Sequence, residues 1–331
     1  MSNKINIAYT PDDNYINLTI VSMQSVIENN KDCDIEFIIG YSKLSNHSLS
    51  KLKWMESNKN CSIRFVKIDE ADFQGMTVSC WVTIQAWFRI KIPELCPDLD
   101  KILYLDCDTL INDSIINLWN IDLKNNYLAA VKDIINVDKH IKRLKMEDNY
   151  YFNSGVLLLN CVKFREDDVF HKIKDITKSN LYDILYCDQD TLNIIADSKK
   201  IDLEKKYNYM ELWNNNGYFE YFDEEEKEYI KARNNPVIIH MVGTKPTHKA
   251  CKHSYLDSWW KYAKETNIYD ELFETYNNSE IRKRSNKIIK TIFSVYCEYS
   301  RNKKWRVINF LGIKFKINVS KHKRRINKSD K

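Results

Sequence analysis

Two aspartates separated by one residue follow an apolar stretch of the chain. Lys101–Leu105 (KILYL) has the pattern of a buried strand and continues directly into Asp106, Cys107 and Asp108. Two carboxylates at the end of such a strand repel each other unless a cation lies between them. Because oxygen ligands that leave room for phosphate oxygens suit Mn²⁺ or Mg²⁺, the pair predicts a divalent metal site that binds a diphosphate. A strand-end turn, in which Asp106 caps the following backbone, is the structural alternative.

Phosphohydrolase chemistry of the haloacid dehalogenase type is an enzymatic alternative. These enzymes also carry Asp-x-Asp after an apolar strand, and their first aspartate acts as a nucleophile. They place a threonine four positions after that aspartate, whereas Thr109 follows Asp106 by three positions. The spacing therefore favours the metal site.

Three further groups of polar residues lie near the ends of predicted elements. His240 ends a β-branched run and precedes Lys245. The imidazole of His240 could complete a metal site while the ammonium of Lys245 contacts phosphate. Residues 151–155 (YFNSG) and 186–190 (YCDQD) hold amides and carboxylates that could bind sugar hydroxyl groups. A backbone-bonded histidine, a turn and a helix N-cap are the respective structural alternatives.

The elements that must position these residues form an α/β pattern. Up to about residue 240, short β-branched runs alternate with segments of helical period, which is typical of a mostly parallel sheet with crossover helices. Ligands bind at the carboxyl ends of the strands in such sheets. We predict strands at 4–10, 34–40, 62–68, 101–105, 127–132, 155–160 and 236–240. We predict helices from residue 15, at 45–58, at 84–92 where Pro93 should end the helix, at 162–178 and at 189–198.

The net charge of +5 is unevenly divided along the chain. Residues 279–331 hold seventeen Lys or Arg and three acidic residues, so that this segment carries +14 and the first 278 residues carry −9. We therefore predict a catalytic domain at 1–278 and a basic, aromatic-rich C-terminal extension at 279–331.

Composition excludes several other classes of protein. Hydrophobic residues make up 44% of the chain, which favours a folded globular protein over a disordered one. No apolar run approaches the roughly 20 residues needed to cross a bilayer, and the N-terminus lacks the apolar core of a signal peptide, so a cytoplasmic protein is expected. The nine cysteines are scattered without a Cys-x-x-Cys pair, which predicts reduced thiols.

Five motifs follow one another along the chain: IAYTPDDNY, WFRIKIPE before KILYLDCDTL, NSGVLLLN, CDQDTLN and HMVGTKP. In this order they resemble glycosyltransferase family 8, a retaining family that includes lipopolysaccharide galactosyl- and glucosyltransferases. The resemblance covers nearly the first 260 residues and implies a nucleotide-sugar-binding α/β fold of the GT-A type. It also implies a hexose donor, UDP-glucose or UDP-galactose, and a role in lipopolysaccharide or other surface polysaccharide synthesis.

The resemblance also implies roles for individual residues. Asp188 and Gln189 are the predicted catalytic residues, because either could stabilise the cationic anomeric carbon, by covalent attack or by guiding same-face substitution. Two positions depart from the family: one residue, rather than two, separates Gly243 from Lys245, and Cys107 replaces a residue that is often alanine. The implied sets are Asp106, Asp108 and His240 for a metal, usually Mn²⁺; Thr10, Asp12, Asn14 and Lys245 for the nucleotide; and Arg89, Asn153, Asp188 and Gln189 for the donor sugar.

The acceptor and the extension are interpreted from composition. Residues 207–229 include Trp213 and Tyr218, whose rings could stack on an acceptor saccharide or glycolipid; a surface loop is the structural alternative. Aromatic and basic residues alternate in the extension, which predicts peripheral attachment to the anionic inner face of the membrane. No nucleic-acid recognition motif is present. A non-catalytic protein that binds a sugar nucleotide stays an alternative to the transferase.

Overall fold

The computed structural model describes residues 3–58, 60–76, 83–179, 181–211 and 223–279, and the backbone of 293–300, 303–310 and 313–318. Contacts group the chain into two compact units. The first contains residues 1–246 and 250–272, and the second contains residues 247–249 and 273–331. The predicted acceptor residues Trp213 and Tyr218 lie outside the described residues.

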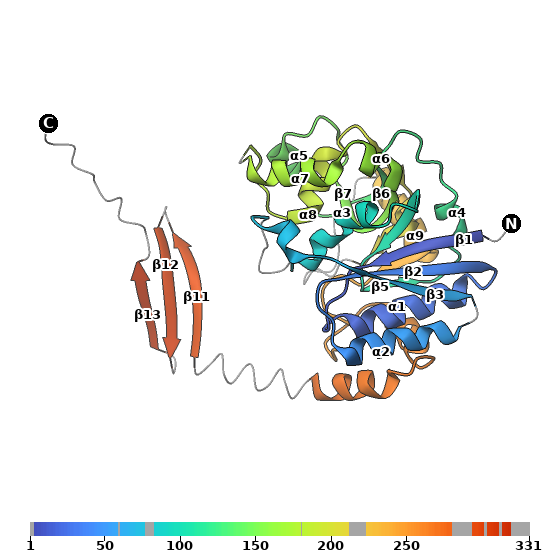
Figure 1. Cartoon of the computed structure of the whole chain (residues 1–331). Coiled ribbons are helices and arrows are strands. Elements are labelled where there is room, and N and C mark those ends of the chain that lie inside the picture. Colours follow the sequence, from blue (N-terminus) through green and yellow to red (C-terminus); the bar gives the residue numbers. More distant parts are fainter. Residues whose placement is uncertain are drawn as a thin grey trace, which may run out of the picture. The chain divides into compact units, whose positions relative to one another are not determined.

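A seven-stranded sheet forms the centre of the first unit (Figure 1). Its strand order is β3-β2-β1-β4-β7-β6-β8, and all neighbours pair in parallel except β7, which is antiparallel to both β4 and β6. The predicted mostly parallel sheet is therefore confirmed. The strands are β1 (Asn3–Tyr9), β2 (Cys33–Tyr41), β3 (Cys61–Lys67), β4 (Lys101–Leu105), β6 (Leu128–Lys132), β7 (Phe152–Asn160) and β8 (Lys200–Leu203).

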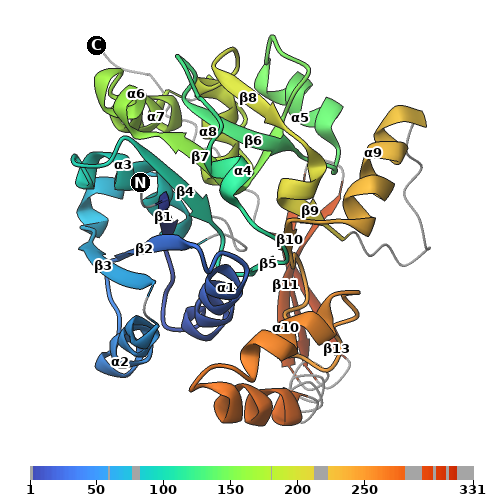
Figure 2. The same cartoon turned by 90° about the vertical axis from the view of Figure 1, so that its right-hand side faces the viewer.

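Helices cover both faces of this sheet and create two apolar cores. Side chains of successive strand residues point to opposite faces, so Leu103 joins the core that contains α1, whereas Tyr104 joins the core that contains α3. Figure 2 shows α1 and α2 on one side of the strands and α3 on the other. The helices are α1 (Ile16–Asn29), α2 (Asn46–Trp54), α3 (Gln85–Leu95), α4 (Ile116–Trp119), α5 (Val137–Leu144), α6 (Cys161–Glu166), α7 (Val169–Lys178), α8 (Cys187–Ile195), α9 (Asp223–Asn234) and α10 (Leu256–Ala263).

A second, three-stranded sheet supports the chain next to the end of β4. It has the order β5-β10-β9, where β10 is antiparallel to β5 and parallel to β9. The strands are β5 (Thr109–Ile111), β9 (Tyr209–Met210) and β10 (Ile238–His240); short 3₁₀ helices lie at Met55–Ser57 (η1), Glu70–Phe73 (η2) and Lys205–Asn208 (η3). The predicted strand that ends on His240 thus belongs to this small sheet and not to the central one.

Two predicted helices differ from the observed ones. Helix α3 continues to Leu95 with Pro93 inside it, because a proline in the last helical turn removes only one backbone hydrogen bond. The predicted helix at 162–178 is two helices, α6 and α7, since Asp168 between them adopts a left-handed conformation with φ of 51°.

The second unit contains three strands, β11 (Phe293–Ser300), β12 (Lys303–Phe310) and β13 (Ile313–Asn318), which pair antiparallel in that order. Among the described residues, no helix is both long enough and apolar enough to span a bilayer.

Candidate active site

The two aspartates lie on a tight turn between β4 and β5. The Asp106 N–H donates to the Gly155 carbonyl of β7 at 2.7 Å, and the Thr109 N–H and hydroxyl donate back to the Asp106 carbonyl at 3.1 and 2.8 Å. The Asp106 carboxylate itself accepts from the Tyr104 hydroxyl at 2.9 Å and pairs with Arg89. Backbone groups close the turn, so both carboxylates are available to the site.

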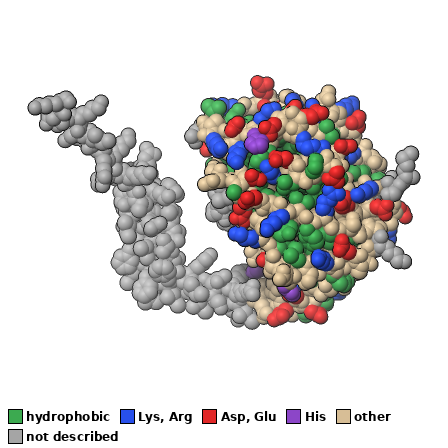
Figure 3. Space-filling model, in the orientation of Figure 1, with side chains coloured by type: hydrophobic (Ala, Val, Ile, Leu, Met, Phe, Trp, Pro, Cys, Tyr) green, Lys and Arg blue, Asp and Glu red, His purple; other side chains and the backbone are tan. Residues whose placement is uncertain are grey.

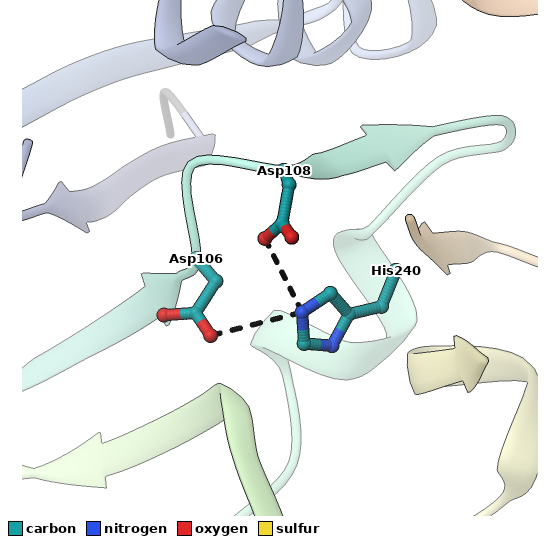
Figure 4. Close-up of side chains that lie close together, drawn as sticks. All are labelled: Asp106, Asp108 and His240. Atoms are coloured by element: carbon teal, nitrogen blue, oxygen red, sulfur yellow. Dashed lines mark ion pairs between the residues drawn. The ribbon is translucent and has the colours of Figure 1, made fainter. Parts of the chain in front are cut away.

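Asp106, Asp108 and His240 converge on one point, as Figure 4 shows. The His240 Nε2 atom lies 3.7 Å from Asp106 Oδ2 and 3.3 Å from Asp108 Oδ1, and the three potential ligand atoms lie within 4.8 Å of one another. Pairing of β10 with β5, in which His240 lies opposite Thr109, brings the histidine to the aspartates. Two carboxylate oxygens and an imidazole nitrogen at this spacing fit Mn²⁺ or Mg²⁺.

Gly155 provides the space that this cluster needs. A Cβ atom at this position would lie 2.2 Å from His240 Cε1 and 2.9 Å from Asp106 Oδ2, closer than side chains pack. The residue is in β7, whose antiparallel direction brings the beginning of this strand to the edge where β1 and β4 end. Residues 151–155 therefore reach the site from the start of a strand, whereas the sequence pattern predicted that polar groups of the site follow the carboxyl ends of strands.

Lys245 reaches the same cluster despite its unusual spacing from Gly243. Its ammonium forms an ion pair with Asp108 Oδ2. Burial alone would raise the pKa of Asp108, but His240 and Lys245 hold that pKa below its ordinary value. Burial also opposes the charge of His240, yet the two carboxylates outweigh it and raise the pKa of the imidazole.

Arg89 connects the aspartate pair with the start of α8. Arg89 is 5% exposed, and its Nη2 atom lies 3.0 Å from Asp106 Oδ1 while Nε lies 3.2 Å from Asp188 Oδ2. It also donates to the Ser154 carbonyl at 2.5 Å and lies 4.4 Å from the ring centroid of Tyr104. Burial and the nearby Asp106 raise the pKa of Asp188 to about 6, although Arg89 opposes the shift.

Gln189 is held by bonds at both ends of its carboxamide. Oε1 accepts from the Ser154 N–H at 3.0 Å and from Asn153 Nδ2 at 3.3 Å. Nε2 donates to Asp133 Oδ2 at 3.0 Å and to the Tyr151 hydroxyl at 3.1 Å. The orientation of the amide is therefore fixed, since a backbone N–H can bond only to its oxygen.

Neither Asp188 nor Asp190 is the N-cap of α8, because Tyr186 holds that position without a side-chain bond. Asp190 is fully buried, accepts from the N–H groups of Leu185 and Tyr186 at 2.7 and 2.8 Å, and forms two bonds to Arg143 at 2.8 and 2.9 Å. It anchors the beginning of α8. Asp188 instead faces Arg89 and accepts from the Ser154 hydroxyl at 3.1 Å.

A cavity of about 280 Å³ joins these groups. Asn14 does not line it: this residue is exposed, and its N–H donates to Asp12 Oδ1 at 2.9 Å. Asn153 and His240 are not lining residues either, although both contact residues that are. Predicted residues that line the cavity are Thr10, Asp12, Arg89, Asp106, Asp108, Asp188, Gln189 and Lys245.

Other lining residues were not predicted individually, although Ser154 and Tyr186 lie within the predicted groups 151–155 and 186–190. Tyr15 is 39% exposed at the cavity and ends the motif IAYTPDDNY, so an aromatic ring next to a nucleotide-binding motif was the available signal. Tyr186 precedes the CDQD motif and is 46% exposed. The remaining unpredicted residues are Thr83, Gln85, Ala86, Tyr104, Cys107 and Ser154.

The fold is that of the GT-A glycosyltransferases, as comparison with solved structures shows. Residues 6–251 match the profile of glycosyl transferase family 8, and the chain belongs to this family. The predicted resemblance is therefore confirmed, and membership supports a hexosyltransferase over the phosphohydrolase alternative.

Several relatives illustrate the relationship. The galactosyltransferase LgtC, solved in complex with donor and acceptor sugar analogues, is 27% identical with a TM-score of 0.69, over 80% of this chain and 96% of that one. A Haemophilus influenzae protein described as a glycosyltransferase is 30% identical over 76% of each chain. The lipopolysaccharide 1,2-glucosyltransferase of Escherichia coli K12 is 28% identical over 74% of this chain and 73% of that protein.

Proposed function

We propose that this chain is a metal-dependent, retaining glycosyltransferase that moves glucose or galactose from a UDP-sugar to a glycan of the bacterial surface, such as lipopolysaccharide. The observation that carries the proposal is the shared cavity. Asp106 and Asp108 of the candidate metal cluster line it together with Arg89, Asp188 and Gln189. The retaining outcome and the UDP donor are supported by family membership.

In this proposal, different residues around the cavity bind different parts of the donor. Asp12 and the exposed ring of Tyr15 are suited to hydrogen bonding and stacking with a nucleoside. When bound at Asp106, Asp108 and His240, a divalent cation would neutralise the diphosphate and favour its departure. The Lys245 ammonium can leave Asp108 and bind a phosphate oxygen instead, because lysine carries a compact charge on a flexible side chain.

Asp188 and Gln189 would act on the sugar. Both lie at the start of α8 and line the cavity. The pairing of Asp188 with Arg89 supports an ionised carboxylate there, which would stabilise positive charge at the anomeric carbon. Arg89 and Asn153 would hold donor hydroxyl groups or the residues that bind them.

The direct test is release of UDP from a panel of UDP-hexoses, measured with the full chain and Mn²⁺. We expect EDTA to abolish release, added Mn²⁺ to restore it, and Asp106→Asn to be inactive. Undiminished turnover by Asp106→Asn in metal-free buffer would contradict the proposal. Cleavage of simple phosphomonoesters with Mg²⁺ would instead identify a phosphohydrolase, and UDP binding without turnover a non-catalytic protein.

The proposed acceptor contact and membrane attachment have separate tests. If Trp213 and Tyr218 bind the acceptor, Trp213→Ala should raise the acceptor KM, and an unchanged KM would argue against this role. The +14 charge of residues 279–331 supports binding to an anionic inner membrane face. Anionic liposomes should sediment the full chain but not a variant without this segment, and equal sedimentation would exclude attachment by the extension.

A further inference from the structure

Asn208 is a buried amide that connects the candidate metal cluster with the donor-sugar residues. It ends η3, directly before β9, and is only 1% exposed. Its Oδ1 atom lies 3.1 Å from His240 Nδ1, and its Nδ2 atom donates to Asn153 Oδ1 at 2.9 Å. The sequence placed Asn208 in the segment 207–229, interpreted as the acceptor region, but predicted no role for the residue itself.

One backbone group fixes how the amides of Asn153 and Asn208 are oriented. The Gly155 N–H donates to the side chain of Asn153 at 2.9 Å, so the atom that accepts must be the oxygen Oδ1. The same oxygen faces Asn208, which must therefore present its NH₂ group to it. The other end of the Asn208 amide is then its oxygen, and it faces His240.

This orientation decides which ring nitrogen of His240 carries the permanent proton. Nδ1 faces an oxygen that can only accept, so Nδ1 must be the N–H group. Nε2, which faces Asp106 and Asp108, is then the atom that holds either an exchangeable proton or a metal. Histidines that bind metals commonly donate their other N–H to a fixed acceptor, which sets the ring orientation.

We propose that Asn208 is a positioning residue with two separate effects: it fixes the tautomer and orientation of His240, and it holds Asn153 against Gln189. The first effect acts on metal binding, and the second acts on the donor sugar. The inference rests on the proposed metal site and deepens it. Asn153 passes this effect on to Gln189 by a direct hydrogen bond, in which Asn153 Nδ2 donates to Gln189 Oε1 at 3.3 Å.

Two substitutions separate the two effects. Asn208→Ala removes both bonds, so the affinity for Mn²⁺, measured by calorimetry on the full chain without nucleotide, should fall roughly 10- to 100-fold. Asn208→Asp keeps an acceptor for His240 Nδ1 but places two oxygens face to face at Asn153, so Mn²⁺ affinity should stay near that of the wild type while kcat for UDP release falls. Unchanged Mn²⁺ affinity in Asn208→Ala would overturn the proposal, as would equal losses in both variants.

Asn30→Ala is the matched control for loss of a buried amide. Asn30 is 3% exposed, donates to the Val26 carbonyl at 2.9 Å and accepts from the Ile115 N–H at 3.0 Å, in a part of the first unit that does not line the cavity. We expect similar thermal destabilisation and unchanged Mn²⁺ affinity. A loss of affinity equal to that of Asn208→Ala would assign the effect to general destabilisation and overturn the specific role.

The tautomer can be read in the metal-free protein, which separates failure of this inference from failure of the proposed function. Nitrogen-15 NMR of the histidine-labelled full chain, at a pH high enough to keep the imidazole neutral, should show His240 protonated at Nδ1. Asn208→Ala should lose this preference. Protonation at Nε2 in the wild type would overturn the inference, whereas a wild-type chain that binds no Mn²⁺ but shows the Nδ1 tautomer would contradict only the metal site.

Discussion

The two halves of the site treat their polar groups differently. In the half that we propose binds a metal, the metal half, Asp106, Asp108 and His240 aim three potential ligand atoms at a common point, and Asp108 is paired with Lys245. In the half that we propose binds the donor sugar, the sugar half, Gln189 is bonded at both ends by groups of the protein itself. The ligand atoms of the first half therefore face a shared space, whereas the amide of the second half is already fixed by the protein. Substitutions should weaken binding in the first half and turnover in the second.

The largest expected effect is loss of a metal ligand. Asp108→Asn removes one carboxylate charge from the cluster, and we expect UDP release to fall on the order of 10³-fold, because metal stabilisation of the leaving group contributes several kcal/mol. Calorimetry should show that Mn²⁺ binding is lost as well. Normal Mn²⁺ affinity combined with lost turnover would break the comparison, since Asp108 would then act on the sugar.

Gly155→Ala tests whether the space beside His240 is essential. The added Cβ would overlap His240 Cε1 and displace the ring, so Mn²⁺ affinity should fall roughly 10- to 100-fold. Overpacking should also lower the free energy of unfolding by about 1–3 kcal/mol, measured in urea. Gly75→Ala serves as a control for adding a methyl group where nothing lies within 4 Å, although its positive φ of 87° adds strain of its own. Wild-type Mn²⁺ affinity in Gly155→Ala would show that the ring can move without cost.

Lys245→Met should separate the contribution of the Lys245 ammonium to UDP binding from that of the bound metal. We expect UDP affinity in the presence of Mn²⁺ to fall roughly tenfold, because a charge-assisted hydrogen bond to phosphate is lost. Mn²⁺ affinity without UDP should not fall, since Lys245 no longer occupies Asp108 Oδ2. The exposed Lys252→Met is the control for loss of one positive charge. Weaker Mn²⁺ binding in Lys245→Met alone would mean that the ammonium supports the metal site.

The smallest expected effect is a pH dependence in the sugar half. Asp188 has its pKa raised to about 6 by burial, so it is ionised above that pH and protonated below it. A cation beside Asp106 would lower this pKa, so kcat/KM should fall between pH 7 and pH 5.5 by at most roughly fourfold. The residual activity of Asp188→Asn should lack this acid limb. An identical limb in that variant would assign it to another group, such as a metal ligand.

The sequence allowed prediction of the parts that depend on local patterns. Residues 102–105 of β4 are apolar and buried and are followed by two aspartates, so both the burial of the strand and the position of the carboxylates could be predicted. The motif CDQDTLN likewise allowed prediction that Asp188 and Gln189 belong to the site, and both line the cavity. His240 was predicted as a ligand from its position after a strand, although the strand belongs to a different sheet.

The parts that could not be predicted depend on pairing between distant segments. The pattern of apolar residues in β7 is the same for either strand direction, so its antiparallel pairing left no local signal. Asn208 lies in KKYNYM, where an asparagine usually indicates a turn, and its role arises only when η3 meets β7 and β10. The restriction on Gly155 likewise comes from His240, which is 85 positions away in the sequence.

The reversed strand β7 has a consequence for how relatives of this protein can diverge. Two consecutive N–H groups at its beginning hold side chains of the site: that of Ser154 bonds Gln189, and that of Gly155 bonds Asn153. A register shift of one residue would move the Ser154 N–H away from Gln189 and turn every side chain of the strand to the opposite face. Insertions and deletions in this segment would therefore be purged by selection, and new donor preferences would have to evolve through substitutions around an unchanged strand start.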